Sequence, residues 1–191
     1  TKHLIFTFIA ILIMILISAA KTELFVKLVF PLFFISFVLL ALVPIIGVEV
    51  KGARRWIDLY LFRLQPIEIL KPFFILMTVK ILTYEKFKDS QIKYILSFIL
   101  LSSVLILLID QPDLGQSILL IVSWIATVFI SGVSLIYLFI FFSFFLIAIS
   151  SVLFFFPEKF GYIIIRLITF FDPNQGDKFQ SSSALEAIKL G

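Results

Sequence analysis

The sequence contains no cysteine, one histidine and few charged residues. The absence of cysteine excludes disulfides, thiolate nucleophiles and cysteine-ligated metal sites, and it leaves the redox compartment undetermined. His3 stands at the start of the chain and cannot by itself form a histidine-rich metal site. Charged residues make up 15% of the chain, against about a quarter in soluble domains. A soluble helical domain would also need polar positions every three or four residues, which long windows of this sequence lack.

Most of the chain is apolar. Of its 191 residues, 62% are hydrophobic and 25 are phenylalanine, and the mean hydropathy is +1.19. This composition is typical of a membrane protein rather than of a soluble domain. The net charge of +4 therefore bears on membrane topology and on anionic lipid or substrate groups, and we do not expect nucleic acid as a partner.

Six apolar stretches approach the length of about twenty residues that a helix needs to cross the hydrocarbon core. They occupy residues 4–20, 28–46, 67–82, 94–109, 114–130 and 135–156. They predict an all-α polytopic membrane protein with a single domain, followed by a polar, turn-rich tail at residues 157–191. The chain opens on Thr1, and its first apolar run lacks a small-residue cleavage site. We therefore expect a true span at this run and a chain that is a fragment.

The charges that flank these stretches leave the orientation open. Lysines alone lie on one side, whereas every arginine lies on the other, where positive charges are somewhat more numerous. The planar guanidinium of arginine suits phosphate and carboxylate recognition, so arginines used for binding would distort the count.

The connection between the second and third stretches concentrates charge in the sequence VKGARRWIDL, at residues 50–59. Its cations and its tryptophan are Lys51, Arg54, Arg55 and Trp56. One interpretation is that these side chains anchor the chain at the lipid headgroups. The other is a binding site, because three cations within five residues exceed what anchoring requires, and Gly52 allows a close approach of the backbone.

A second polar motif, LQPIEILK, begins the third apolar stretch at residues 64–71. Glu68 and Lys71 are three residues apart, so on a helix they share a face and can pair. Each charge would cost about 2.5–3.5 kcal/mol at the membrane centre, which makes intramembrane charges candidates for a functional site. The alternative is a purely structural ion pair between helices.

A third motif, DQPDLGQS, lies between the fourth and fifth stretches at residues 110–117. Asp113 follows a proline and precedes an apolar helix, where the positive end of the helix dipole favours an anion. Helix capping is the plain interpretation of this residue. Asp110 ends an apolar stretch, and we expect it to face the surface.

The motifs VKGARRWI, LQPIEILK and QPDLGQS, in this order and between spans of these lengths, resemble those of the SEDS family of FtsW and RodA proteins. The first motif looks more like the division member than the elongation member. The resemblance implies ten spans in the complete protein, of which this chain is similar to the second to the seventh. It also implies that residues 47–66 and the tail face outward, with the tail as the start of a large extracytoplasmic loop.

The resemblance implies polymerisation of lipid II, the undecaprenyl diphosphate-linked disaccharide-pentapeptide, by glycosyl transfer. The implied substrate-binding residues are Lys51, Arg54, Arg55, Trp56, Gln65, Glu68, Lys71 and Asp113. The first three suit the departing diphosphate, Trp56 a sugar face or lipid, and Glu68 and Lys71 a cavity wall. The essential aspartate of the family lies in a stretch beyond Gly191. No catalytic residue is therefore expected in this chain, which should be inactive alone.

The family further implies the bacterial plasma (inner) membrane as the location, with a class B penicillin-binding protein transpeptidase and divisome proteins as partners. The cofactor is unknown, with a divalent cation as the one candidate, and no metal-ligating residue is assigned. Two other functions stay open. One is a lipid II flippase or transporter, since charged residues in a membrane cavity suit transport equally well. The other is a non-catalytic divisome scaffold.

Overall fold

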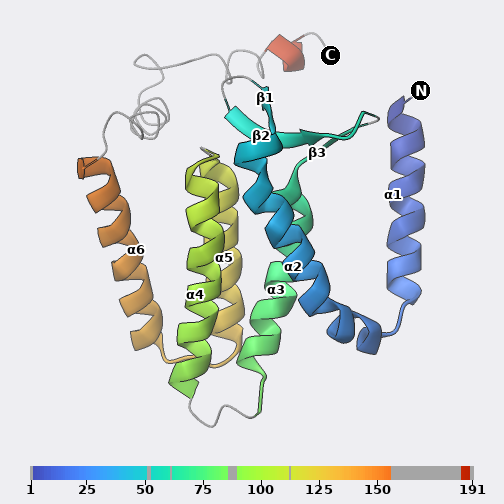
Figure 1. The fold of residues 1–191 in the computed structure, drawn as a ribbon. Coiled ribbons are helices and arrows are strands. Elements are labelled where there is room, and N and C mark those ends of the chain that lie inside the picture. Colours follow the sequence, from blue (N-terminus) through green and yellow to red (C-terminus); the bar gives the residue numbers. More distant parts are fainter. Residues whose placement is uncertain are drawn as a thin grey trace. The chain divides into compact units, whose positions relative to one another are not determined.

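The computed structural model describes residues 2–50, 53–60, 62–85, 90–111, 113–155 and 186–189. The chain divides into two compact units, Thr1–Gly132 and Val133–Gly191, and each is described by itself. The described part of each is mainly helical, which confirms the predicted fold class (Figure 1). The tail predicted at 157–191 lies outside the described residues, apart from a helical turn at 186–189.

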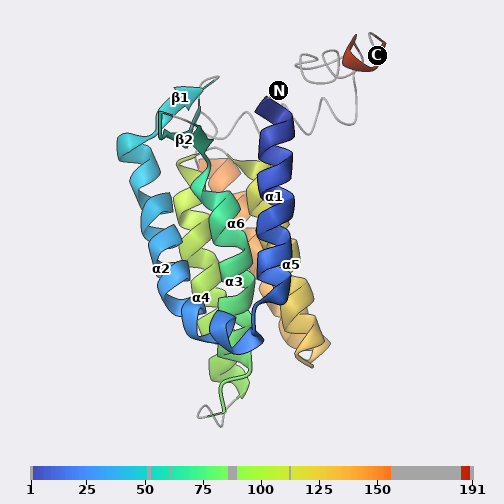
Figure 2. The ribbon, with the colours of Figure 1, turned by 90° about the vertical axis from the view of Figure 1, so that its right-hand side faces the viewer.

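The first unit contains five helices in its described part. These are α1 (Lys2–Ala19), α2 (Thr22–Ile46), α3 (Pro66–Leu82), α4 (Ser90–Ile109) and α5 (Leu114–Ile130). Helix α3 packs against α2, α4 and α5, so it forms the centre of the bundle (Figures 1 and 2). Fully buried apolar side chains such as Phe74 of α3, Leu101 of α4 and Trp124 of α5 fill the space between these helices.

The buried indole of Trp124 is the largest side chain in this core. Its Nε1 donates to the hydroxyl of Ser97 at 3.3 Å, and its ring meets Phe98 edge to face with centroids 5.8 Å apart. An indole N–H needs such a partner when it is removed from water. The contact therefore joins α4 and α5 by packing and by a hydrogen bond.

Large apolar side chains also cover the outside of the helices. The described side chains of α1 are exposed from Leu4 to Ala19, and α6 (Leu135–Phe155), in the second unit, is mostly exposed as well. Among the described residues, Thr22–Ile46 and Gln91–Ile109 are long and apolar enough to cross a membrane, while three further apolar helices are shorter. Each of the six predicted stretches overlaps one helix, although α2 and α4 begin six and four residues earlier than predicted, and a count of six crossings stays a prediction.

The connection at residues 47–66 forms a small antiparallel sheet, which the sequence analysis did not anticipate. Its strands are β1 (Val48–Val50), β2 (Ala53–Asp58) and β3 (Arg63–Leu64), paired in the order β1-β2-β3. Side chains alternate across a strand, so Arg55 and Ile57 lie on one face of β2, and Arg54 and Trp56 lie on the other. The described part of the charged segment thus contains a regular sheet rather than an irregular loop.

A proline and a glycine mark helix ends at opposite ends of the bundle. Pro66 is the first residue of α3, where a missing N–H costs nothing. At the other end of the bundle, Gly132 has a φ of +83°, and its N–H bonds the Phe129 carbonyl at 3.1 Å. The chain turns tightly at Ser131-Gly132, because glycine adopts a positive φ without steric cost.

Candidate functional site

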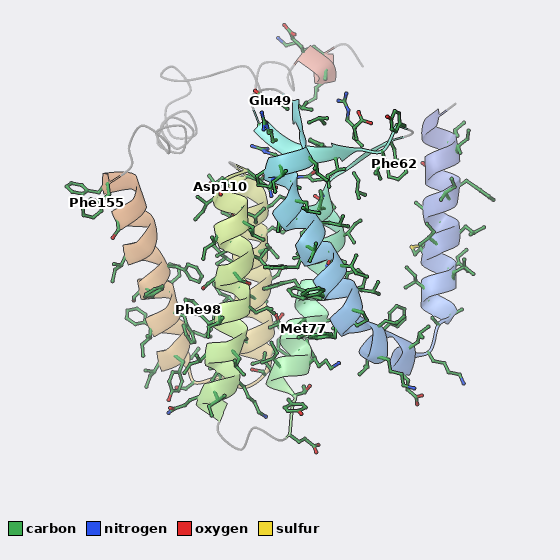
Figure 3. All side chains as sticks on the ribbon, viewed as in Figure 1. Glu49, Phe62, Met77, Phe98, Asp110 and Phe155 are labelled. Atoms are coloured by element: carbon green, nitrogen blue, oxygen red, sulfur yellow. The ribbon has the colours of Figure 1, made fainter. Side chains whose placement is uncertain are left out.

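Polar side chains gather at the end of the bundle where α2 ends and where α3 and α5 begin. The sheet lies at this same end (Figures 1 and 2). In Figure 3, the labelled Glu49 and Asp110 mark this end, whereas Met77 and Phe98 lie farther along the helices among apolar side chains. Asp110 is exposed there, as expected from its position.

Glu68 and Lys71 form the predicted ion pair, with Nζ of Lys71 2.6 Å from Oε2 of Glu68. A third residue, Gln116, forms hydrogen bonds with both members of this pair. The Gln116 side chain accepts from Nζ of Lys71 at 2.9 Å and donates through Nε2 to Oε1 of Glu68 at 2.7 Å. The Lys71 side chain is only 18% exposed, against 49% for Glu68. The ion pair itself lies within α3, and the two hydrogen bonds of Gln116 join it to α5.

Gln116 was missed as a site residue in the sequence analysis. It lies three residues after Asp113, in the first turn of α5, so both side chains rise from the same end of that helix. That spacing was a usable signal. The contact with Lys71, however, spans 45 positions of the sequence and depends on how α3 packs against α5.

Asp113 caps α5 and receives two further groups. One carboxylate oxygen accepts from the backbone N–H of Gln116 at 3.5 Å, which confirms the capping interpretation. The other accepts from Nε2 of Gln65 at 3.1 Å and lies 3.7 Å from Nη1 of Arg55. With its side chain 11% exposed, this carboxylate connects β2, the start of α3 and α5.

Arg55 is held at two points of the connection between α4 and α5. Its Nε donates to the backbone carbonyl of Gln111 at 2.9 Å, and its Nη1 faces Asp113. The side chain is 25% exposed. Two fixed partners orient a planar guanidinium much better than one does, so this arginine is pre-positioned.

The other members of the predicted binding set are placed differently. Arg54 lies on the opposite face of β2, where it is 3.8 Å from Glu49 and more than half exposed. Its Nη1 also lies 3.5 Å from the Pro44 carbonyl oxygen. Trp56 is half-buried and pairs with Val48 of β1, and Lys51 lies outside the described residues. The structure thus brings together Arg55, Gln65, Glu68, Lys71 and Asp113, and it does not bring Arg54 to them.

The resulting arrangement is one polar network with two cation–carboxylate pairs. Gln116 joins the pairs, since its backbone N–H bonds Asp113 and its side chain bonds Glu68 and Lys71. Such a network can bind hydroxyl-rich or anionic groups by exchanging an internal contact for a ligand contact. Among the residues that the structure describes, no three or more His, Cys, Asp or Glu side chains are grouped to hold a metal ion.

Comparison with known proteins identifies the family. Residues 1–191 match the model of the FtsW/RodA/SpoVE family, described as cell cycle proteins. The chain belongs to this family. It is 36% identical over 162 residues to a probable peptidoglycan glycosyltransferase FtsW of Marinomonas mediterranea, an alignment that covers 80% of this chain and 38% of the relative. It is 32% identical over 136 residues to the corresponding protein of Aliivibrio salmonicida, covering 70% of this chain and 34% of the relative.

Two solved structures share the fold. A chain from a peptidoglycan synthase complex that coordinates polymerization and crosslinking matches 85% of this family member and 49% of its own length, with a TM-score of 0.72 and 29% identity. The rod shape determining protein RodA of Thermus thermophilus matches 65% of this chain and 41% of its own length, with a TM-score of 0.59 and 31% identity. These matches confirm a membrane protein of the predicted family. The chain spans 34–38% of the length of the curated relatives that it matches first.

Proposed function

We propose that this chain forms part of a peptidoglycan glycosyltransferase that polymerises lipid II during cell division. The observation that carries the proposal is the family match over residues 1–191, with relatives named as peptidoglycan glycosyltransferases FtsW. The motif VKGARRWI favours the division member over the elongation member. The protein acts as a multi-pass protein of the bacterial plasma membrane.

The polar network is the proposed contact for lipid II. A diphosphate leaving group gains negative charge in the transition state, and fixed cations stabilise that charge best when they need no rearrangement. Arg55 and Lys71 meet this condition, because each is held by a carboxylate and by a second acceptor. Gln65, Glu68 and Asp113 hold these cations in place and offer acceptors for sugar hydroxyls.

The remaining predicted residues have roles outside the network. Lys51 and Arg54 contribute positive charge for the departing diphosphate, and Trp56 contacts a sugar face or lipid. We assign removal of the proton from the attacking hydroxyl to a carboxylate of the complete protein beyond Gly191. The sheet then faces outward, and the lysine-rich ends of the helices face the cytoplasm.

A class B penicillin-binding protein is the proposed partner, together with divisome proteins. Support for this proposal comes from the likeness to a chain of a peptidoglycan synthase complex, at a TM-score of 0.72. In such an assembly, polymerisation by one membrane protein would be coupled to crosslinking by the other.

The test is lipid II polymerisation by the complete protein together with its penicillin-binding partner, followed as a ladder of fluorescent glycan products. We expect Arg55→Gln to lower turnover by about tenfold or more, since removing one transition-state charge contact typically has this effect. Arg63→Gln is the matched control, because Arg63 pairs with Asp58 at the exposed edge of the same sheet. Lipid II translocation in vesicles without any polymer would instead favour a flippase, and partner binding without turnover a scaffold.

A further inference from the structure

A backbone carbonyl inside α2 has lost its helical hydrogen-bond donor. Pro44 lies within this helix and has no N–H, so the carbonyl of Leu40, four residues earlier, lacks the backbone donor that a regular helix would give it. Leu40 is fully buried at 0% exposure. A carbonyl removed from water in this way needs a partner, because an unsatisfied buried acceptor destabilises the fold.

Gln111 supplies the missing donor. Its side-chain Nε2 lies 3.3 Å from the Leu40 carbonyl oxygen, and the residue is 1% exposed. The bond crosses 71 positions of the sequence, from the connection between α4 and α5 to the last third of α2. A buried glutamine side chain is costly unless it is hydrogen-bonded, so the carbonyl and the amide satisfy each other.

The same residue holds the arginine of the candidate site. The backbone carbonyl of Gln111 accepts from Nε of Arg55 at 2.9 Å, and Asp113, two positions later, faces the same guanidinium. Gln111 thus joins two structural elements through different atoms. Its side chain hydrogen-bonds the Leu40 carbonyl of α2, and its backbone carbonyl accepts a hydrogen bond from Arg55 of β2.

We infer that Gln111 is a positioning residue, which fixes Arg55 and Asp113 against the proline break of α2. This inference rests on the proposed function insofar as Arg55 contacts the substrate. A leucine at this position would fill the volume but leave the Leu40 carbonyl unpaired, and the connection would move to relieve it. A displacement of about 1 Å at a positioned group can lower a rate by two orders of magnitude.

The proline allows a direct test. In a Pro44→Ala variant the new backbone N–H of residue 44 donates to the Leu40 carbonyl, so the side chain of Gln111 is no longer needed there. The experiment compares the wild type, Gln111→Leu, Pro44→Ala and the double variant, each in the complete protein with its partner. The measurements are lipid II turnover, the thermal midpoint and hydrogen exchange of the β2 amides at residues 53–58.

Gln111→Leu is expected to reduce turnover about tenfold or more through displacement of Arg55, and to raise exchange in β2. Pro44→Ala should stay within about twofold of the wild type. The double variant should resemble Pro44→Ala in turnover and in exchange. Exchange near Trp124, in the middle of α5, should be the same in all four proteins, which separates a positioning effect from general loosening.

Two results would overturn the inference. One is a double variant as impaired as Gln111→Leu alone, and the other is unchanged exchange in β2 when Gln111 is replaced. If Gln111→Leu does not fold, recovery of folding in the double variant supports the inference, and its absence refutes it. The exchange and thermal measurements need no turnover. A wild type that makes no polymer would therefore refute the proposed function without deciding the role of Gln111.

Discussion

Removing Glu68 is expected to destabilise the protein more than removing Lys71, although the two side chains form one ion pair. The reason lies in the group that each substitution leaves behind. Glu68→Ala leaves an ammonium that is 18% exposed and retains one amide acceptor, from Gln116. Lys71→Met leaves a carboxylate that is 49% exposed and retains the Gln116 amide as a donor.

The magnitudes follow from this difference in exposure. A largely buried charge that loses its partner costs about 3–5 kcal/mol, and the partial exposure of Lys71 reduces this to about 2–3 kcal/mol. A half-exposed carboxylate is hydrated instead, so Lys71→Met should cost about 1 kcal/mol. The methionine keeps most of the apolar stem of lysine, which limits the loss of packing.

The assay is equilibrium unfolding of the purified protein in lipid nanodiscs, followed by tryptophan fluorescence, to which the buried Trp124 and the half-buried Trp56 both contribute. The expected gap of about 1.4 kcal/mol between the variants corresponds to about a tenfold difference in the unfolding constant. The double variant should cost less than the sum of the two single variants, because it leaves neither charge unpaired. Arg63→Ala, which breaks the exposed pair with Asp58, should cost under about 0.5 kcal/mol and serves as the control. Equal losses for Glu68→Ala and Lys71→Met, or a larger loss for the latter, would refute the reasoning from burial.

Three further outcomes are expected from unfolding measurements on the same protein. Asp113→Ala should cost about 2–3 kcal/mol of stability, because it removes the α5 cap and the acceptor of Gln65. Asp113→Asn should keep the cap and cost less, and equal costs for the two variants would contradict this account. Phe74→Ala should cost about 3–5 kcal/mol of stability, whereas Leu76→Ala, on the exposed side of α3, should cost under about 1 kcal/mol. Similar losses for the two variants would mean that the packing of α3 is described wrongly. Gly132→Ala should cost about 1 kcal/mol of stability through the positive φ alone, since open space surrounds the added methyl group. An unchanged midpoint of unfolding would count against that strain.

The membrane class and the positions of the helices followed from the sequence. Hydropathy and helix length are local properties, so apolar stretches such as 114–130 match a helix of the structure residue for residue. Pairing of Glu68 with Lys71 and capping by Asp113 were also predictable, because both depend on spacings of three residues within one helix. The motifs, together with their order, predicted the family.

The sheet at residues 48–64 could not be read in the same way. Its strands are two to six residues long and carry charges, so their alternation is too short to stand out. Without the sheet, nothing distinguished Arg54 from Arg55. Strand alternation separates them, and it directs one toward Glu49 and the other toward Asp113.

What the sequence by itself determined is which residues can lie in a membrane, roughly where its helices lie, and which charges are close neighbours along one helix. Only the tertiary structure decided that Gln116 would join Glu68 and Lys71, and that Gln111 would meet the carbonyl freed by Pro44. The physical reason is that local spacing sets the first group of features. The second group depends on contacts across 45 and 71 positions, which arise only when α2, α3 and α5 pack at one end of the bundle.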